Sequence, residues 1–218
     1  MRRTIGSTSM MCGIARISPF FLLGGLLLAG TVAAAENASS RGDDVTGAWT
    51  VEQVVASLKE ERQTAVPFEE ATYSSVLTEP LISRGLLRFT PPSRLEKEVL
   101  EPYRERYIVE GDLVTFESER KRVKKTISLE DYPGLRGFVE AFRAGFTGDA
   151  AQLKQMYETA LDGNREKWTL QLRPRDQAGQ SMVDSIQFSG SHGRIGTITI
   201  RAPDGDRSVM TLSRKPAP

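Results

Sequence analysis

Strand-like alternation is clearest in the run Arg94-Leu95-Glu96-Lys97-Glu98-Val99, in which Leu95, Lys97 and Val99 alternate with three charged residues. Successive side chains of a β-strand point to opposite faces, so a period of two predicts a strand with one face toward the interior and one toward water. Segments with the same period extend from this run in both directions along the chain.

The pattern of residues from about 67 to 129 predicts a series of short strands separated by turns. Pro80, Pro91-Pro92 and Pro102 lie between the segments, where proline costs no hydrogen bond of a sheet. Gly111 lies in a predicted hairpin turn, where it would supply a positive φ. The segments, 68–77, 81–90, 94–100, 103–110, 113–119 and 123–129, predict an antiparallel meander.

Two amphipathic helices interrupt the strand pattern. Thr50 and Gln53 form a capping box ahead of a helix with Val51, Val54, Val55 and Leu58 on one stripe. A second stripe consists of Leu135, Phe138, Val139, Phe142 and Phe146.

Period-two segments resume after the second helix at 156–161, 166–172, 182–188, 195–201 and 208–212. A sheet this long must curl or split. We therefore predict an α+β fold: a curled antiparallel half-barrel of about eleven strands, with an N-terminal helix and an inserted helical lid.

The N-terminal residues have the composition of a secretory signal. Arg16 precedes an apolar stretch, residues 17–29, and Ala33-Ala34-Ala35 then supplies the small residues that a signal peptidase recognises. The apolar stretch is shorter than the roughly 20 residues that a membrane span needs. We predict a signal peptide at 1–35, a flexible leader at 36–47 and a single domain at 48–218.

Composition excludes several classes of function from the predicted mature chain. Cleavage after residue 35 removes the sole cysteine, Cys12, which excludes disulfides and thiol chemistry. All 28 acidic residues remain against 26 of the 29 Lys and Arg, so the net charge near −2 does not indicate nucleic acid.

No cluster of residues predicts an enzyme, a metal site or a cofactor. His192 is the single histidine and lies in a predicted exposed turn. Glu69-Glu70 and Asp43-Asp44 do not form acid/base pairs, because neighbours on a strand point to opposite faces, and they are interpreted as surface charge. Asp204-Gly205-Asp206 is interpreted as a hairpin turn rather than a calcium loop.

Four stretches carry a resemblance to a known family: Pro67-Phe68-Glu69-Glu70, residues 80–89, residues 91–96 and residues 166–174. Together with the order of elements, they resemble the LolA-like outer-membrane lipoprotein carrier proteins, in the superfamily that includes LolB and LppX-like proteins. The resemblance covers nearly the whole predicted mature chain and implies a half-barrel under helical lids.

The resemblance implies a periplasmic, non-enzymatic carrier that shields the acyl chains of a lipoprotein, lipid or lipid-linked product during transfer towards the outer membrane. An inner-membrane transporter and an outer-membrane acceptor would be its partners, with transient membrane contact, and we expect a monomer. The alternative is an interaction module that senses lipoproteins or lipids and acts through a protein partner.

Three groups of residues are candidates for these roles. The aromatic stripe of the second helix is either ordinary core or the lid of a cavity. If it is a lid, the cavity residues are Leu87, Phe89, Leu95 and Val99 with Phe138, Val139, Phe142 and Phe146. The lid-fastening arginine that the family has before its proline is Pro91 here, so Arg94 is the candidate lid contact.

A cluster of cations follows the fifth predicted strand. It consists of Arg120, Lys121, Arg122, Lys124 and Lys125. It is either a solvated hairpin or a docking patch for a transporter loop or for anionic headgroups.

Overall fold

The computed structural model describes residues 49–60, 65–90 and 93–213 of the 218-residue chain. The predicted signal peptide, the leader and the Pro91-Pro92 pair lie outside the described residues.

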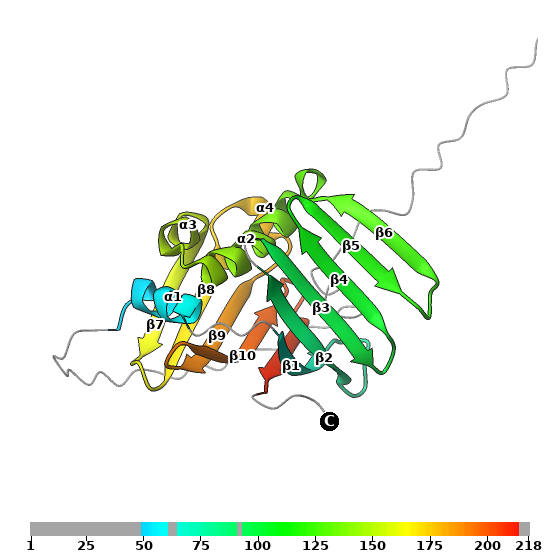
Figure 1. Cartoon of the computed structure of the whole chain (residues 1–218), viewed down its shortest axis with the longest axis horizontal. Helices are drawn as coiled ribbons and strands as arrows, with labels where there is room; N and C mark the ends of the chain where they lie inside the picture. The colour runs from blue at the N-terminus through cyan, green and yellow to red at the C-terminus, as the bar shows by residue number, and fades with distance from the viewer. Residues whose placement is uncertain (1–48, 61–64, 91–92, 214–218) are drawn as a thin grey trace, which may run out of the picture.

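One antiparallel sheet of 11 strands forms the body of the protein, in the order β6-β5-β4-β3-β2-β1-β11-β10-β9-β8-β7 (Figure 1). Its two halves are consecutive meanders that meet where β1 pairs with β11, with Phe68 opposite Leu212. The strands are β1 (Ala65–Tyr73), β2 (Leu81–Thr90), β3 (Arg94–Glu101), β4 (Glu105–Glu110), β5 (Leu113–Ser118), β6 (Val123–Ser128), β7 (Tyr157–Gly163), β8 (Trp168–Pro174), β9 (Ser185–Ser191), β10 (Arg194–Arg201) and β11 (Arg207–Leu212).

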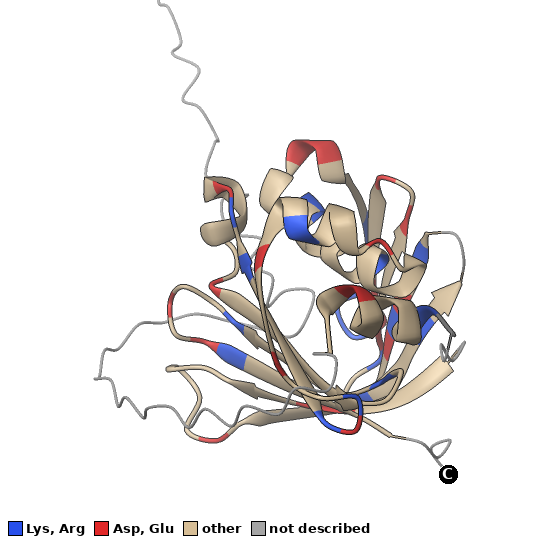
Figure 2. Cartoon of the chain, turned by 90° about the vertical axis from the view of Figure 1, so that its left-hand side faces the viewer, with Lys and Arg blue, Asp and Glu red and all other residues tan. Residues whose placement is uncertain are grey.

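The sheet stays open, and β6 and β7 form its two edges. The chain therefore has to cross the whole sheet between these strands, and it does so as η2 (Leu129–Asp131), α2 (Pro133–Thr147) and α3 (Ala150–Met156). The helices lie on one side of the curved sheet, its concave face (Figure 2). This is the predicted curled half-barrel with an inserted helix, and the fold class is confirmed.

The first helix, α1 (Val51–Glu60), begins at the predicted capping box. The Thr50 amide donates to Gln53 Oε1 at 2.9 Å, and the Gln53 amide donates to Thr50 Oγ1 at 3.3 Å. Val54 and Val55 are fully buried. Helix α1 packs on α2 and reaches β10.

Helix α2 has Pro133 in its first turn and ends at Thr147; the next residue, Gly148, caps it with a φ of 88°. Leu135, Val139 and Ala144 are buried against the sheet and the other helices. The predicted amphipathic stripe is thus the face that α2 turns to the sheet.

Two of the predicted strands differ from the structure by three residues or more at each end. Strand β1 ends at Tyr73 rather than at 77, because a turn in which the Leu77 amide donates to Ser74 O at 3.0 Å follows it. The predicted strand at 182–188 is displaced to 185–191 by a short helix, α4 (Gln177–Gln180). Asp176 caps this helix by accepting from the Gly179 amide at 2.7 Å.

Candidate functional site

The register of β2 and β3 places the four predicted strand residues of the cavity on one face. Phe89 lies opposite Leu95, Leu87 opposite Lys97, and Gly85 opposite Val99. Because side chains alternate along a strand, Leu87, Phe89, Leu95 and Val99 share a face of the sheet. This is the concave face, because Leu87 and Leu95 line a pocket together with Phe138 of α2.

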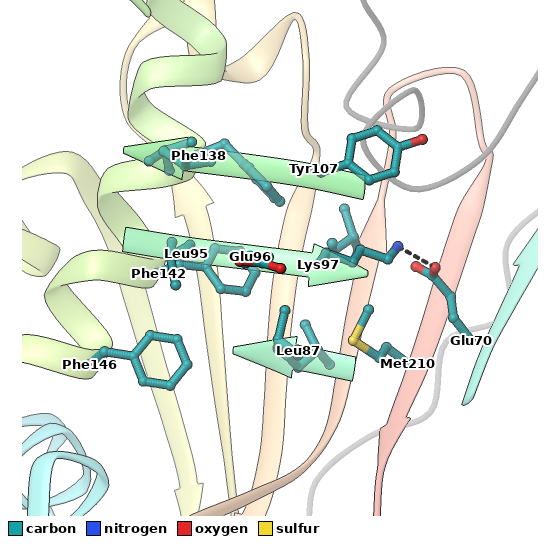
Figure 3. Close-up of a pocket in the computed structure, with 14 residues that line it drawn as sticks. Glu70, Leu87, Leu95, Glu96, Lys97, Tyr107, Phe138, Phe142, Phe146 and Met210 are labelled. Carbon is teal, nitrogen blue, oxygen red and sulfur yellow. Dashed lines mark hydrogen bonds and ion pairs between the residues drawn. The ribbon is translucent and has the colours of Figure 1, made fainter. Parts of the chain in front are cut away.

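Helix α2 turns its aromatic side chains toward this face (Figure 3). Phe146 stacks on Phe89 with 4.8 Å between ring centroids. Phe142 lies 5.0 Å from Phe138 and makes an edge contact with Phe188 of β9 at 5.5 Å. The helix therefore contacts both halves of the sheet through phenylalanine rings.

An apolar pocket of about 90 Å³ remains between α2 and the sheet. Both walls are mainly hydrocarbon: the helix supplies Phe138, Val139, Phe142 and Phe146, and the sheet supplies Leu87, Leu95, Tyr107, Val109, Ile198, Ile200 and Met210. A dry cavity of about 150 Å³ is known to accept benzene. In this arrangement of α2, the pocket is too small for an acyl chain.

A second pocket of about 450 Å³ lies beside the first, and Leu87 and Phe146 line both. Its lining also includes Leu58 of α1, Phe89, Trp168 and Ile195. This volume falls within the roughly 300–1,000 Å³ of ordinary ligand sites. Val99 is a core residue, and neither pocket includes it in its lining.

A buried ion pair lies at one end of the first pocket, opposite the phenylalanines (Figure 3). Lys97 Nζ is 2.5 Å from Glu70 Oε2, and the two side chains are 9% and 0% exposed. Ser208 donates to the other carboxylate oxygen, and Ser83 donates to Oε2 at 3.4 Å. The interpretation of Glu70 as surface charge was therefore wrong, because its side chain points to the concave face; Glu69, pointing the other way, pairs with exposed Arg84.

Burial dominates the ionisation of the groups at this end of the pocket. Desolvation lowers the pKa of Lys97, and the charge of Glu70 opposes this effect. Desolvation and the carboxylate of Glu105 raise the pKa of Tyr107, whose hydroxyl donates to Glu105 at 3.0 Å. The pocket is thus apolar under α2 and polar at its far end.

Arg94 does not hold the helix in this structure, which corrects its expected role as a lid contact. Its guanidinium lies 2.6 Å from Glu110 and 3.4 Å from Glu96. Glu96 also pairs with Arg88 and Arg106 at 3.3 and 2.8 Å. Arg94 and Glu96 alternate with Leu95, so this cluster lies on the convex face, away from α2.

Arg94→Gln is therefore expected to lower the free energy of unfolding by no more than about 1 kcal/mol, since one third of the side chain is exposed. Glu96→Gln should cost about 2 kcal/mol, because it removes the buried carboxylate that three arginines share. Urea denaturation measures both. Equal losses in the two variants would contradict this assignment.

The predicted docking cations lie on the exposed β5–β6 hairpin. The Arg120 guanidinium lies 4.0 Å from the ring centre of Tyr103, on the neighbouring β3–β4 hairpin. Lys124 pairs with Glu117 at 2.7 Å, and Lys121 lies 3.7 Å from Glu105. Arg122 and Lys125 are exposed as well.

The other polar motifs form turns. His192 is exposed in the β9–β10 turn with a φ of 53°, and the Asp206 amide donates to Asp204 Oδ1 at 3.1 Å. Within the described ranges, no three His, Cys, Asp or Glu side chains gather as metal ligands would. No helix in this part of the chain is long and apolar enough to cross a membrane.

Sequence reasoning missed the half of the pocket wall that comes from distant strands. Ile198, Ile200 and Met210 reach the pocket because β10 and β11 follow β1 in the sheet. The sequence predicted the strand segments 195–201 and 208–212 that carry them, but no local pattern places these strands beside β1. The signal for Lys97 was its position between Leu95 and Val99 on the apolar face.

The sequence matches the family model of outer membrane lipoprotein carrier protein LolA-like proteins over residues 44–215. No curated protein matches the sequence.

Several solved structures are similar, all at low identity. A LolA superfamily protein of Nitrosomonas europaea is 12% identical with a TM-score of 0.42, over 78% of this chain and 96% of that one. A putative outer membrane lipoprotein-sorting protein domain of Vibrio parahaemolyticus is 10% identical with a TM-score of 0.40, over 74% and 89%. In the Pseudomonas aeruginosa MucA/MucB complex, the matching chain is 12% identical with a TM-score of 0.37, over 76% and 58%.

The family model covers most of the chain, including all of the described sheet and helices. The chain therefore belongs to the outer membrane lipoprotein carrier protein LolA-like family.

Proposed function

We propose that the protein is a periplasmic, non-enzymatic carrier of acyl chains. It would be exported by a cleaved signal peptide at 1–35, as a single domain from 48 onward. Its cargo would be a lipoprotein, a lipid or a lipid-linked product, transferred towards the outer membrane. Membership in a family of lipoprotein carriers supports this proposal.

The observation that carries the proposal is the apolar space between α2 and the concave face, with phenylalanine rings on one wall and aliphatic side chains on the other. Each buried CH2 group contributes about 0.8 kcal/mol, so a long acyl chain is held in a bilayer by roughly 10 kcal/mol. A carrier has to offer a comparable apolar surface. The residues proposed to supply it are Leu87, Phe89, Leu95, Phe138, Val139, Phe142 and Phe146 with Val99 behind them.

An acyl chain can enter the space beneath α2 only if the helix moves, because that pocket is small. Leu87 and Phe146 separate this pocket from the larger one. Withdrawal of the Phe146 ring from Phe89 would join the two spaces into one elongated cavity. We propose that this movement admits the acyl chain.

The donor and the acceptor of such a cargo are membrane-bound, so the carrier must approach both membranes. We propose the exposed cations Arg120, Lys121, Arg122, Lys124 and Lys125 as the docking surface. Their position on a hairpin, away from the pocket, leaves the cavity free during docking.

Fluorescence quenching by a brominated fatty acid tests the carrier function. Trp168 lines the larger pocket and is 1% exposed, so bound bromine atoms should quench it. A Trp49→Phe background makes Trp168 the sole reporter of the two tryptophans. We expect saturable quenching of delipidated protein at micromolar probe concentration, and its absence would contradict the proposal.

The matched variants are Leu87→Asp and Leu113→Asp. Leu87 lines both pockets, whereas Leu113 is 52% exposed and contributes to neither. A carboxylate in the cavity should weaken binding about tenfold or more, because its desolvation costs more than about 1.4 kcal/mol. Leu113→Asp should bind the fatty acid as the unmodified protein does.

A further inference from the structure

Exposed large hydrophobic side chains gather at one end of the sheet. Among the described residues there are eight, and seven of them lie on the β1–β2, β3–β4 and β5–β6 hairpins. We call these seven the apolar rim: Tyr73, Val76, Leu77, Leu81, Ile82, Tyr103 and Val123. The eighth, Leu113, lies at the opposite end of the sheet, after the β4–β5 turn.

The three hairpins are neighbours in space. Strands β1 to β6 are consecutive in the sheet, so the turns that join β1 to β2, β3 to β4 and β5 to β6 lie at the same end. They lie at the lower right of Figure 1. The register agrees, since Thr72 pairs with Leu81, Arg84 with Glu101, and Glu105 with Ser118.

The same end of the sheet also carries a group of cationic side chains. The β5–β6 hairpin carries Arg120, Lys121, Arg122, Lys124 and Lys125, all exposed. Arg120 packs its guanidinium on the ring of Tyr103, which joins the basic hairpin to the apolar rim. The next turn along the same end, between β10 and β11, carries Asp204 and Asp206 and adjoins the β1–β2 hairpin, on the side away from the basic hairpin.

We propose that the apolar rim and the basic hairpin together dock on the surface of an anionic lipid bilayer. Exposed Val, Leu and Ile side chains can enter the acyl region, while tyrosine rings and cations suit the headgroup layer. Basic residues near the surface add attraction to anionic lipids. This inference rests on the proposed carrier function, because a carrier exchanges its cargo at membranes.

Docking by this end leaves the pocket walls untouched. None of the seven rim residues lines either of the two larger pockets. Membrane attachment and cargo binding can therefore be measured separately, by vesicle binding and by fatty-acid quenching. A variant that loses the first should keep the second.

The experiment is cosedimentation of the protein with phosphatidylcholine vesicles, with and without phosphatidylglycerol. Val76→Ser combined with Leu77→Ser should weaken binding to the anionic vesicles about tenfold or more, because it removes two apolar groups from the bilayer. Lys124→Gln combined with Lys125→Gln should weaken it by about fivefold for each cation, and only on anionic vesicles. The controls are Leu113→Ser and Arg165→Gln, both at the opposite end of the sheet, and they should bind as the unmodified protein does.

A fluorescent probe shows whether the rim enters the bilayer. In a Cys12→Ser background, a nitrobenzoxadiazole label at Leu77→Cys should shift its emission to the blue on anionic vesicles, whereas a label at Leu113→Cys should not. Equal binding by all variants, or an equal loss in the rim variants and the controls, would overturn the inference. Absence of fatty-acid quenching in the unmodified protein would instead contradict the carrier function, and the result on vesicle binding would still hold.

Discussion

Lys97→Met is expected to lower the free energy of unfolding by about 3–5 kcal/mol, because it leaves the carboxylate of Glu70 buried without its cation. Glu70 is fully buried, and after the substitution its described polar contacts are the hydroxyls of Ser83 and Ser208. Methionine closely matches the length of the lysine stem, so packing against Phe68 should change little. Urea denaturation of the two proteins at neutral pH measures the difference.

The double variant Glu70→Gln with Lys97→Met separates the ion pair from the packing around it. It removes both charges, and glutamine can still accept the hydrogen bond from Ser208. Paired removal of buried charges is often close to neutral, so most of the lost stability should return. A double variant as unstable as Lys97→Met would show that the pairing is not the cause.

Gly85→Ala is expected to lower the free energy of unfolding by about 3 kcal/mol. We expect this to be the largest loss that one added methyl group causes in the sheet. A Cβ at this position would lie 1.8 Å from Glu98 O and 3.0 Å from the ring of Phe68. The backbone of β3 at Glu98 cannot move away from the new methyl group, because it is paired with β2. The register of this pair already shifts between Arg84 and Gly85. Thermal unfolding followed by circular dichroism measures the loss.

Gly196→Ala is the matched control on β10. A Cβ there would meet one neighbour in ordinary contact, Ser189 O at 3.7 Å. Removing glycine from a strand should leave stability unchanged or raise it slightly. Similar losses at the two glycines would contradict the assignment of Gly85 to a close approach between strands.

Local features of the chain were predictable because their causes lie within a few residues. The capping box of Thr50 and Gln53, the turn at Gly111 and the aromatic stripe of α2 each depend on short-range geometry. The same holds for the shared face of Leu87, Phe89 and Leu95, since alternation and one antiparallel hairpin determine it. The inserted position of the helix follows from the break in the period-two pattern.

By itself, the sequence determined the strand and helix pattern, the curled sheet and the family resemblance. Tertiary structure alone decided the opposite wall of the pocket, the convex position of Arg94 and the burial of Glu70. The physical reason is that these depend on which strands pair and in what register: pairing of β1 with β11 brings Ser208 to Glu70 from 138 positions away. From the sequence alone, a carboxylate on a strand is interpreted as surface charge, because the partners that stabilise its burial come from distant parts of the chain.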